Sequence, residues 1–311
     1  MTGRRTGDGL AVEVSGLRKR YGTHQAVDGL DLEVRTGEIF AILGPNGAGK
    51  TTTVEILEGF RTADSGQVLV LGQDPAHAGR QWRSRLGVVM QDSREQSELT
   101  VSELVHHFAT FYPEPRDADE VIDAVGLREK ATNRAAALSG GQRRRLDVAL
   151  GIVGRPELLF LDEPTTGFDP QARRSFWELV KGLRDEGTTI LLTTHYLDEA
   201  AYLADRAAVV RDGRVVALGA PDELGGPDAR RPVVHWTQDG TAHSERTATP
   251  TALVARLARE AAGPDGEVAD LRVVQPSLED VYLGLISGAE LPQATLTHTT
   301  DGTVPDLETT R

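Results

Sequence analysis

The sequence contains no cysteine and very little lysine. Without cysteine, disulfide bonds and thiolate metal sites are excluded, and a reducing cytoplasm is the expected setting. Arginine supplies nearly all of the basic side chains, so each lysine marks a position where a compact ammonium group stands instead of a guanidinium. The lysines are Lys19, Lys50, Lys130 and Lys181.

Long apolar runs are missing as well. No stretch reaches the ~18 residues that span a bilayer, and no apolar region follows the arginines near the start, as it would in a secretory signal.

The formal net charge of −13 disfavours general nucleic-acid binding. With 39% hydrophobic and 26% charged residues, the composition is that of an ordinary globular protein. A length of 311 residues is enough for one large and one smaller domain.

Short β-like runs alternate with helical patterns between Leu10 and Ala220, which predicts an α/β domain around a largely parallel sheet. Strands are expected at 38–44, 66–72, 85–92, 157–164, 188–195, 206–213 and 215–219. Helices are expected at 51–60, 100–112 and 117–125.

Glycine and proline cluster between Glu223 and Pro232, which predicts a domain boundary. A strand, helix, strand and helix are expected after it, at 232–236, 251–262, 268–276 and 277–286. The segment from 289 is polar, threonine-rich and without period. We therefore expect a disordered start at 1–9, a large domain at 10–224, a small C-terminal α/β domain at 232–288 and a disordered tail at 289–311.

The stretch GPNGAGKTT, Gly44 to Thr52, fits the P-loop pattern G-x-x-x-x-G-K-[ST] between a predicted strand and a predicted helix. Its glycines let backbone N–H groups approach phosphate oxygens, and the helix N-terminus adds its dipole. Lys50 is expected to reach the β- and γ-phosphates, and the Thr51 hydroxyl to bind Mg²⁺. A plain glycine-rich turn is the alternative.

Polar residues follow three other predicted strands. Asp162 and Glu163 end an apolar strand, where Asp162 is expected to hold the metal through water and Glu163 to take a proton from an attacking water. His195 ends another strand and is able to hydrogen-bond a γ-phosphate, while Gln91 offers an amide oxygen to metal or water. Taken singly, each of these side chains also fits a plain structural or solvated position.

Six motifs in one order, GPNGAGKTT, Gln91, LSGGQ, LDEP, TTGFD and TTH, closely resemble the nucleotide-binding domain of the ATP-binding cassette (ABC) family. The resemblance covers roughly Leu10 to Ala220. It implies an α/β fold with a RecA-like core, an antiparallel β subdomain and a helical subdomain, followed here by the small C-terminal α/β domain. It also implies a dimer in which each ATP is held by the P-loop of one subunit and the LSGGQ of the other.

The resemblance assigns roles to single residues. Tyr21 is similar to the aromatic that stacks on adenine, and Asp169 to the aspartate that communicates across the dimer. Phe168 stands where the family usually has leucine, which leaves the packing of that loop in doubt. The implied catalytic residues are Glu163, His195 and Gln91, the metal ligands Thr51, Gln91 and Asp162, and the nucleotide-binding residues Tyr21, Gly44, Pro45, Asn46, Gly47, Ala48, Gly49, Lys50, Thr51, Thr52, Ser139, Gly140, Gly141, Gln142 and Asp169.

LSGGQ contains no acid or base, which fits a stretch that completes the site of another subunit. Ser139 supplies a hydroxyl, Gly140 and Gly141 expose N–H groups, and a helix beginning there points its positive end at a γ-phosphate. The arginines that follow, Arg143 to Arg145, either add positive field near the shared phosphate or form a solvated face.

The expected partners are a second copy of the chain and a separate multi-spanning membrane permease, with ATP and Mg²⁺ as cofactors and no nucleic acid. We expect the protein at the cytoplasmic side of the cell membrane. The ending Gln275 to Gly288 resembles ATPases of the daunorubicin-resistance type, which favours export of a drug, antibiotic or other hydrophobic compound. The same stretch also predicts a helix capped by Ser277 and Asp280. An importer subunit and a non-transport ABC ATPase are the alternatives.

Overall fold

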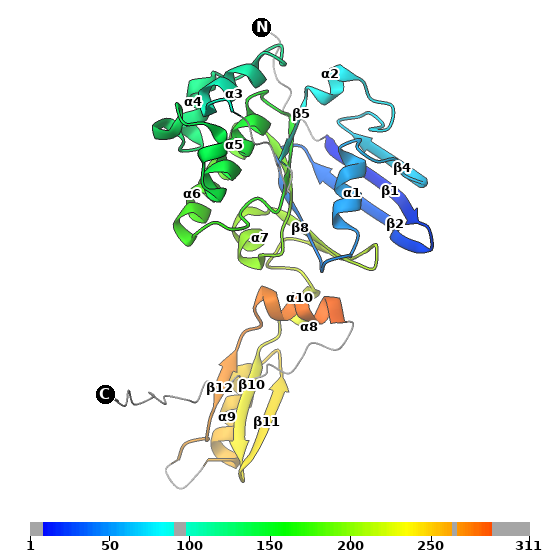
Figure 1. Ribbon diagram of the computed structural model, residues 1–311. Coiled ribbons are helices and arrows are strands. Elements are labelled where there is room, and N and C mark those ends of the chain that lie inside the picture. Colours follow the sequence, from blue (N-terminus) through cyan, green and yellow to red (C-terminus); the bar gives the residue numbers. More distant parts are fainter. Residues whose placement is uncertain (1–8, 90–97, 263–265, 288–311) are drawn as a thin grey trace, which may run out of the picture. The chain divides into compact units, whose positions relative to one another are not determined.

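A computed structural model describes residues 9–89, 98–262 and 266–287 (Figure 1). The chain divides into two compact units, Met1–Pro227 and Asp228–Arg311, each described here by itself. The disordered ends expected at 1–9 and 289–311 lie outside the described residues, apart from Gly9.

The first unit is built on a six-stranded sheet that is parallel except at one edge. All the strands expected from the sequence form, and six of them make up this sheet. Strand β9 pairs antiparallel with β8, whereas the other neighbours are parallel. The order is β5 (Leu86–Val89), β6 (Leu158–Asp162), β7 (Thr189–Thr193), β3 (Ile39–Leu43), β8 (Arg206–Arg211) and β9 (Arg214–Gly219).

Both faces of this sheet are covered, which explains why its central strands are continuous apolar runs. Every residue of β3 and of β7 is buried. Phe40 and Ile42 pack on one face, in a core that also contains Val54 of α1 (Lys50–Leu57). Helices α5 (Gly140–Ile152), α6 (Pro170–Asp185) and α7 (Leu197–Leu203) lie on the other side (Figure 1).

A separate antiparallel sheet packs on α1. It contains β1 (Leu10–Tyr21), β2 (His24–Arg35) and β4 (Ser65–Val70) in the order β2-β1-β4. The strand expected at 66–72 therefore belongs to this sheet. Short helix α2 (Arg80–Arg83) is joined to it by buried Trp82, whose Nε1 donates to Val70 O at 2.8 Å.

The remaining helices of the first unit precede α5. Thr100 caps α3 (Val101–Ala109) with a capping box that includes Glu103, and Asp117 caps α4 (Ala118–Ala124). Helix α3 ends three residues before the expected position, because the following residues form a turn. These helices and α5 contact one another and form the helical part of the unit.

The second unit contains one strand more than expected. Its sheet has the order β11-β10-β12, from β10 (Val233–Gln238), β11 (Thr241–Arg246) and β12 (Arg272–Val274). The prediction of a strand followed directly by a helix was wrong, because a two-residue turn at Asp239 and Gly240, both with positive φ, returns the chain as β11.

One core fixes α9 (Pro250–Glu260) of the second unit on its sheet, through Val234, Leu253 and Leu257. The capping box predicted for α10 (Leu278–Ser287) is confirmed, since Asp280 N donates to Ser277 Oγ at 3.1 Å and Ser277 N to Asp280 Oδ2 at 2.8 Å. Short helix α8 (Gly226–Ala229) lies where the two units join in sequence. Within the described residues, no helix is long and apolar enough to cross a membrane.

Candidate nucleotide-binding site

The phosphate loop and the acidic residues meet at the carboxyl edge of the large sheet. Strand β7 lies between β3 and β6, and its last residue, Thr193, pairs with both Ile42 and Asp162. The loop that follows β3 and the carboxylates that follow β6 therefore flank the same strand end. In open α/β sheets this edge is where ligands bind.

The loop from Gly44 to Gly49 packs so closely on neighbouring backbone that it has no room for a Cβ at two positions. A Cβ on Gly44 would clash with Val210 O, and one on Gly49 would clash with Ala26 O. Gly47 faces open space, but its φ of 81° favours glycine. Between these glycines Ala48 N donates to Pro45 O at 3.2 Å, while Pro45 and Asn46 are exposed.

Lys50 lies beneath this loop, with only 8% of its surface exposed. Its ammonium donates to Gly44 O at 2.6 Å and to Pro45 O at 3.1 Å. Burial lowers the pKa of Lys50, and the negative charges of Glu163 and Asp162 oppose that shift. A buried cation held by neutral carbonyls is suited to a phosphate ligand, which would supply the missing negative charge. Thr51 and Thr52 follow in the first turn of α1, with Thr51 exposed.

The acidic end of β6 is held by Thr193, a residue that the sequence reasoning missed. Thr193 Oγ1 donates to Asp162 Oδ1, and Glu163 N donates to Thr193 O at 3.1 Å. Glu163 has a φ of 45°, which is uncommon outside glycine. His195 Nδ1 lies 3.3 Å from Glu163 Oε1. The side chain of His195 is 45% exposed and that of Glu163 is 15% exposed, so the pair faces an accessible site.

The LSGGQ stretch forms the start of α5. Ser139 is the N-cap and shares a capping box with Gln142, since Gln142 N donates to Ser139 Oγ at 3.3 Å and Ser139 N to Gln142 Oε1 at 3.1 Å. Gly140 has open space where a Cβ would lie. The first turn of a helix has N–H groups without intrahelical partners, so this exposed terminus is able to accept an anion.

Two further predicted residues have clear local contacts. Asp169 caps α6 by accepting from Gln171 N at 2.9 Å and Ala172 N at 2.8 Å. Phe168 beside it is buried, and its ring meets that of Phe176 edge-on at 5.8 Å. Phenylalanine at this position is therefore accommodated by an aromatic pair.

Tyr21 ends β1 with 38% of its surface exposed. Arg61 lies 5.5 Å and Lys19 5.7 Å from its ring centre. An exposed ring at a strand end is available for stacking on a base. The prediction for Gln91 lies outside the described residues.

The three arginines after LSGGQ differ sharply in environment. Arg144 is buried, whereas Arg143 and Arg145 are partly exposed. Arg143 donates to Ala136 O at 3.3 Å. Arg144 is therefore not part of a solvated face, because successive helical residues face different directions.

The donor set fits a nucleoside triphosphate with a divalent cation. The loop offers backbone N–H groups and one ammonium, and Thr51 and Asp162 offer hard oxygen ligands of the kind that Mg²⁺ prefers. A phosphate loop with a buried lysine, beside a strand that ends in paired carboxylates, defines a P-loop nucleoside triphosphatase.

Comparison with known proteins narrows this class. The family model described as ABC transporter matches residues 27–166. The chain is 40% identical over 304 residues to the daunorubicin/doxorubicin resistance ATP-binding protein DrrA of Streptomyces peucetius, with 88% of this chain and 92% of that protein covered. It is 45% identical over 219 residues to the Nod factor export ATP-binding protein I of Ralstonia nicotianae, covering 68% of each.

Among solved structures, cbiO1 of Clostridium perfringens, part of the ABC transporter complex cbiONQ, matches with a TM-score of 0.63 and 29% identity, over 70% of this chain and 90% of that one. The chain belongs to the ATP-binding subunits of ABC transporters. It binds ATP and is an ATP hydrolase. Cassettes of this family form dimers and pair with membrane subunits.

An apolar groove of about 500 Å³ lies between α1, β5 and the helical part. Phe60, which is 66% exposed, lines it together with Phe108 and Tyr112. Phe111, also exposed, meets the ring of Phe108 at 5.7 Å. Glu58 and Arg83 place one carboxyl group and one guanidinium group in this largely apolar lining.

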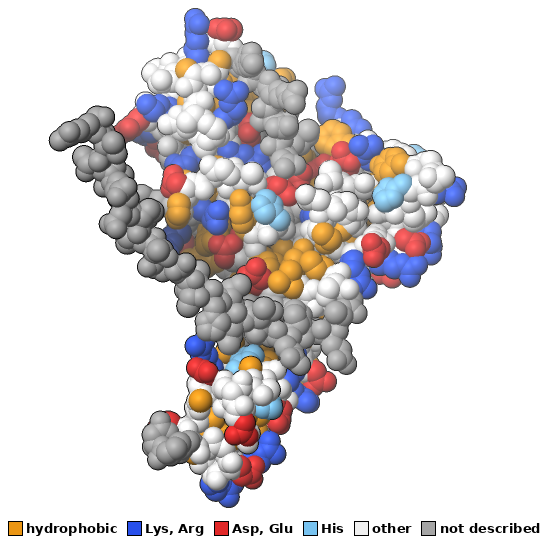
Figure 2. All heavy atoms as spheres, turned by 60° about the horizontal axis from the view of Figure 1, so that its bottom comes forward, with side chains coloured by type: hydrophobic (Ala, Val, Ile, Leu, Met, Phe, Trp, Pro, Cys, Tyr) orange, Lys and Arg blue, Asp and Glu red, His pale blue; other side chains and the backbone are white. Residues whose placement is uncertain are grey.

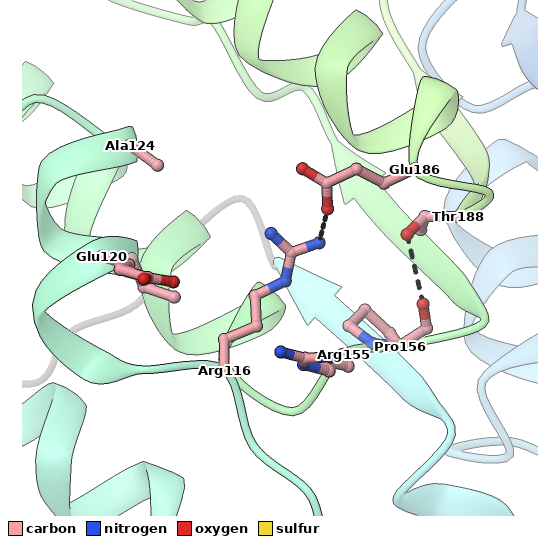
Figure 3. Close-up of a pocket in the computed structure, with 8 residues that line it drawn as sticks. Arg116, Glu120, Ala124, Arg155, Pro156, Glu186 and Thr188 are labelled. Carbon is pink, nitrogen blue, oxygen red and sulfur yellow. Dashed lines mark hydrogen bonds and ion pairs between the residues drawn. The ribbon is translucent and has the colours of Figure 1, made fainter. Parts of the chain in front are cut away.

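A second, polar cavity of about 240 Å³ lies near the amino-terminal ends of β6 and β7, opposite the edge that carries the phosphate loop (Figure 3). Pro156 and Thr188, which precede β6 and β7, line it, and Thr188 Oγ1 donates to Pro156 O at 3.3 Å. The ion pair of Arg116 with Glu186 bridges its wall. Because basic and acidic side chains alternate here, the cavity has no clear preference for an anion.

Charges of both signs are also mixed on the face of the protein in Figure 2, where Lys and Arg side chains lie among Asp and Glu side chains. Such a surface differs from the basic stripe that nucleic-acid binding requires. The absence of a nucleic-acid partner stays a prediction.

Glu58 leads to a prediction about pH. Burial raises the pKa of its carboxyl to about 8, with smaller contributions from the charges of Asp162 and Glu55. The unfolded chain loses this proton near the ordinary value of 4.5, whereas the folded protein keeps it to about 8. The contribution of Glu58 to stability is therefore complete below pH 4.5 and is lost as pH rises towards 8.

Glu58→Gln removes this titration and keeps the shape of the side chain. The thermal midpoint of the nucleotide-free variant should match the wild type near pH 5 and exceed it increasingly up to pH 8.5. Exposed Glu120→Gln is the control and should show no such trend. An offset between Glu58→Gln and wild type that is the same at every pH would contradict the assignment.

Proposed function

We propose that the chain is the energy subunit of an exporter, which moves a drug, an antibiotic or another hydrophobic compound through a separate membrane subunit. The alignment with the daunorubicin/doxorubicin resistance protein carries this proposal. It covers 88% of this chain and therefore extends past Pro227 into the second unit. The Nod factor export relative supports the same direction of transport.

The roles proposed for the site follow from its geometry. Lys50 and the loop N–H groups bind the phosphates, Thr51 and Asp162 are the ligands of Mg²⁺, and Tyr21 stacks on the base. When bound, Mg²⁺ neutralises charge that develops on the phosphates. Glu163 accepts the proton of the attacking water, and His195, 3.3 Å from it, is placed to report the γ-phosphate to the same carboxylate.

The signature residues complete the site of a second copy. Ser139 and the two glycines stand at an exposed helix N-terminus with open space at Gly140. A single chain already has one phosphate loop, so a second anion-binding terminus is best explained by a homodimer with two shared sites. Asp169, which caps α6 in the loop after Glu163, would face the partner in that dimer.

The membrane subunit is proposed to dock in the groove beside β5. Exposed aromatic side chains that line a cavity mark a protein interaction surface. Two other residues that line the groove are Glu58, which follows α1, and Val88, which belongs to β5. Its position therefore links a docked segment to the nucleotide site. We therefore also propose that the protein lies at the cytoplasmic side of the membrane.

Glu163→Gln tests the hydrolytic assignment. The variant should keep wild-type ATP affinity, lose at least ~10²-fold in turnover and accumulate ATP-bound dimers, because the amide cannot accept the proton. Binding is measured with a fluorescent ATP analogue, turnover by phosphate release, and dimers by size-exclusion chromatography. Normal turnover in this variant would remove Glu163 from its proposed role.

Phe60→Ser tests the docking groove and the exporter together. Its ring is exposed, so the fold should survive. When the chain is co-expressed with its membrane subunit, the variant should lose ~10-fold in the amount recovered with membranes. ATP-driven uptake of a hydrophobic dye into inside-out vesicles should fall equally.

Leu218→Ser is the matched control, because Leu218 is also exposed but lies on β9, at the other edge of the sheet. It should leave membrane recovery and dye uptake unchanged. Equal recovery of both variants would reject the groove as the docking site. If the wild-type chain is recovered with membranes but drives no dye movement with ATP, the importer alternative is favoured. If the wild-type chain is not recovered with membranes at all, a non-transport ATPase is favoured.

A further inference from the structure

Arg144 is a buried cation at the second turn of the helix that begins with LSGGQ. Only 7% of its surface is exposed. Its Nε donates to Pro164 O at 3.2 Å, and a terminal guanidinium nitrogen donates to Asp162 O. The two carbonyls belong to the residues immediately before and after Glu163. One planar side chain therefore clamps the backbone on both sides of the proposed base.

The burial of this arginine is unfavourable in itself. Desolvation lowers the pKa of Arg144, and the charges of Asp147, Asp162 and Glu199 partly oppose the shift. A charged group in such a place is tolerated when fixed hydrogen-bond acceptors and carboxylates surround it. Helix packing alone would be served by an apolar side chain, so the charge indicates a further role.

The clamped backbone is also strained. Glu163 has a φ of 45°, and a non-glycine residue persists in the left-handed region when its surroundings hold it there. Glu163 N is held by Thr193 O at 3.1 Å. Arg144 holds the carbonyls on either side. Together these bonds fix the direction in which the Glu163 side chain leaves the backbone.

The same helix also lies close to the same loop at Gly141. A Cβ built on Gly141 would lie 3.9 Å from the ring of Phe168. Phe168 N in turn donates to Thr165 O at 3.0 Å within the loop that connects Glu163 to Asp169. The first turns of α5 and this loop are thus joined by the bonds of Arg144 to the carbonyls beside Glu163, and Phe168 lies close to Gly141 of the same helix.

We propose that Arg144 is a positioning residue that couples the two nucleotide sites of the dimer. Contact of Ser139 and Gly140 with the partner's nucleotide shifts α5, and Arg144 transmits that shift to the backbone of Glu163 in its own chain. Glu163 thereby reaches its working geometry when both sites are filled. This inference rests on the proposed role of Glu163.

Arginine suits this task better than lysine. The guanidinium presents several donors in one rigid plane and reaches two carbonyls that are two residues apart, whereas an ammonium is a single point of charge on a flexible chain. Lysine at position 144 should keep the charge and one of the bonds, and so restore function only in part.

The test compares Arg144→Met and Arg144→Lys with Arg143→Met. Methionine fills much of the same volume without donors, and Arg143 is the neighbouring, partly exposed arginine. ATP affinity and thermal midpoint of Arg144→Met should stay near wild type, while kcat falls ~10²-fold with little change in KM, as expected for a misplaced catalytic group. The kcat of Arg144→Lys should lie between those of Arg144→Met and the wild type. Arg143→Met should have the kcat of the wild type.

A second measurement separates positioning from general packing. In single-turnover experiments, Arg144→Met added to Glu163→Gln should cause no further loss, because both changes act on the same group. Wild-type kcat in Arg144→Met would overturn the inference. A further loss of single-turnover rate in the double variant would overturn it too. So would a loss of ATP affinity in Arg144→Met that is accompanied by a lower thermal midpoint. If Arg144→Met fails to fold, Arg144→Lys decides, and unchanged kcat there rejects the role.

These outcomes are distinct from failure of the proposed function. Normal turnover in Glu163→Gln would reject the base itself. Loss of turnover in Glu163→Gln together with normal turnover in the Arg144 variants would reject only the coupling.

Discussion

The structure depends on a buried ammonium group. Lys50 is held beneath the phosphate loop by two neutral carbonyls and lies in the field of Asp162 and Glu163. Such a cation is incompletely compensated, because carbonyl dipoles replace only part of the hydration that it loses. Phosphate oxygens would complete the compensation. The close packing at Gly44 and Gly49 keeps the loop in the shape that places this charge.

The carboxyl edge of the sheet then decides what surrounds the phosphates. Because β6, β7 and β3 are neighbours and parallel, their ends place acids, a threonine and the phosphate loop together. From this edge two contacts lead outward. His195 lies beside Glu163, and Arg144 extends from the signature helix to the carbonyls on either side of it. The proposed shared nucleotide site is thus joined, through one helix, to the proposed hydrolytic group of the same chain.

Much of the central fold could be predicted from sequence, because parallel strands covered on both faces are continuous apolar runs and their polar ends stand out. The phosphate loop and Asp162 were visible for that reason. The antiparallel sheet of β1, β2 and β4 followed only from the family resemblance. Strand β11 was missed because its residues are polar and mostly exposed, although Asp239-Gly240 was a turn signal that would have revealed it.

Within the site, the residues missed are those whose partners lie far away in the sequence. Thr193 was hidden in an apolar strand, and its contact with Asp162 depends on register across two strands. Arg144 was one of three adjacent arginines, and only helical rotation decides which of them is buried. Patterns of residue types reveal side chains that face a ligand. They do not reveal side chains whose partners are other protein groups far away in the sequence, such as the carboxylate that Thr193 contacts or the carbonyls that Arg144 contacts.

The most direct test of the account mixes two inactive variants. Lys50→Ala removes the phosphate-loop cation, and Gly140→Asp places a carboxylate at the signature helix, where there is space for the side chain. Each variant alone should lack ATPase activity. An equal mixture should regain up to about a quarter of wild-type activity, because half of the dimers are mixed and each has one intact shared site. A mixture that stays as inactive as its components would contradict a site built from two copies of the chain.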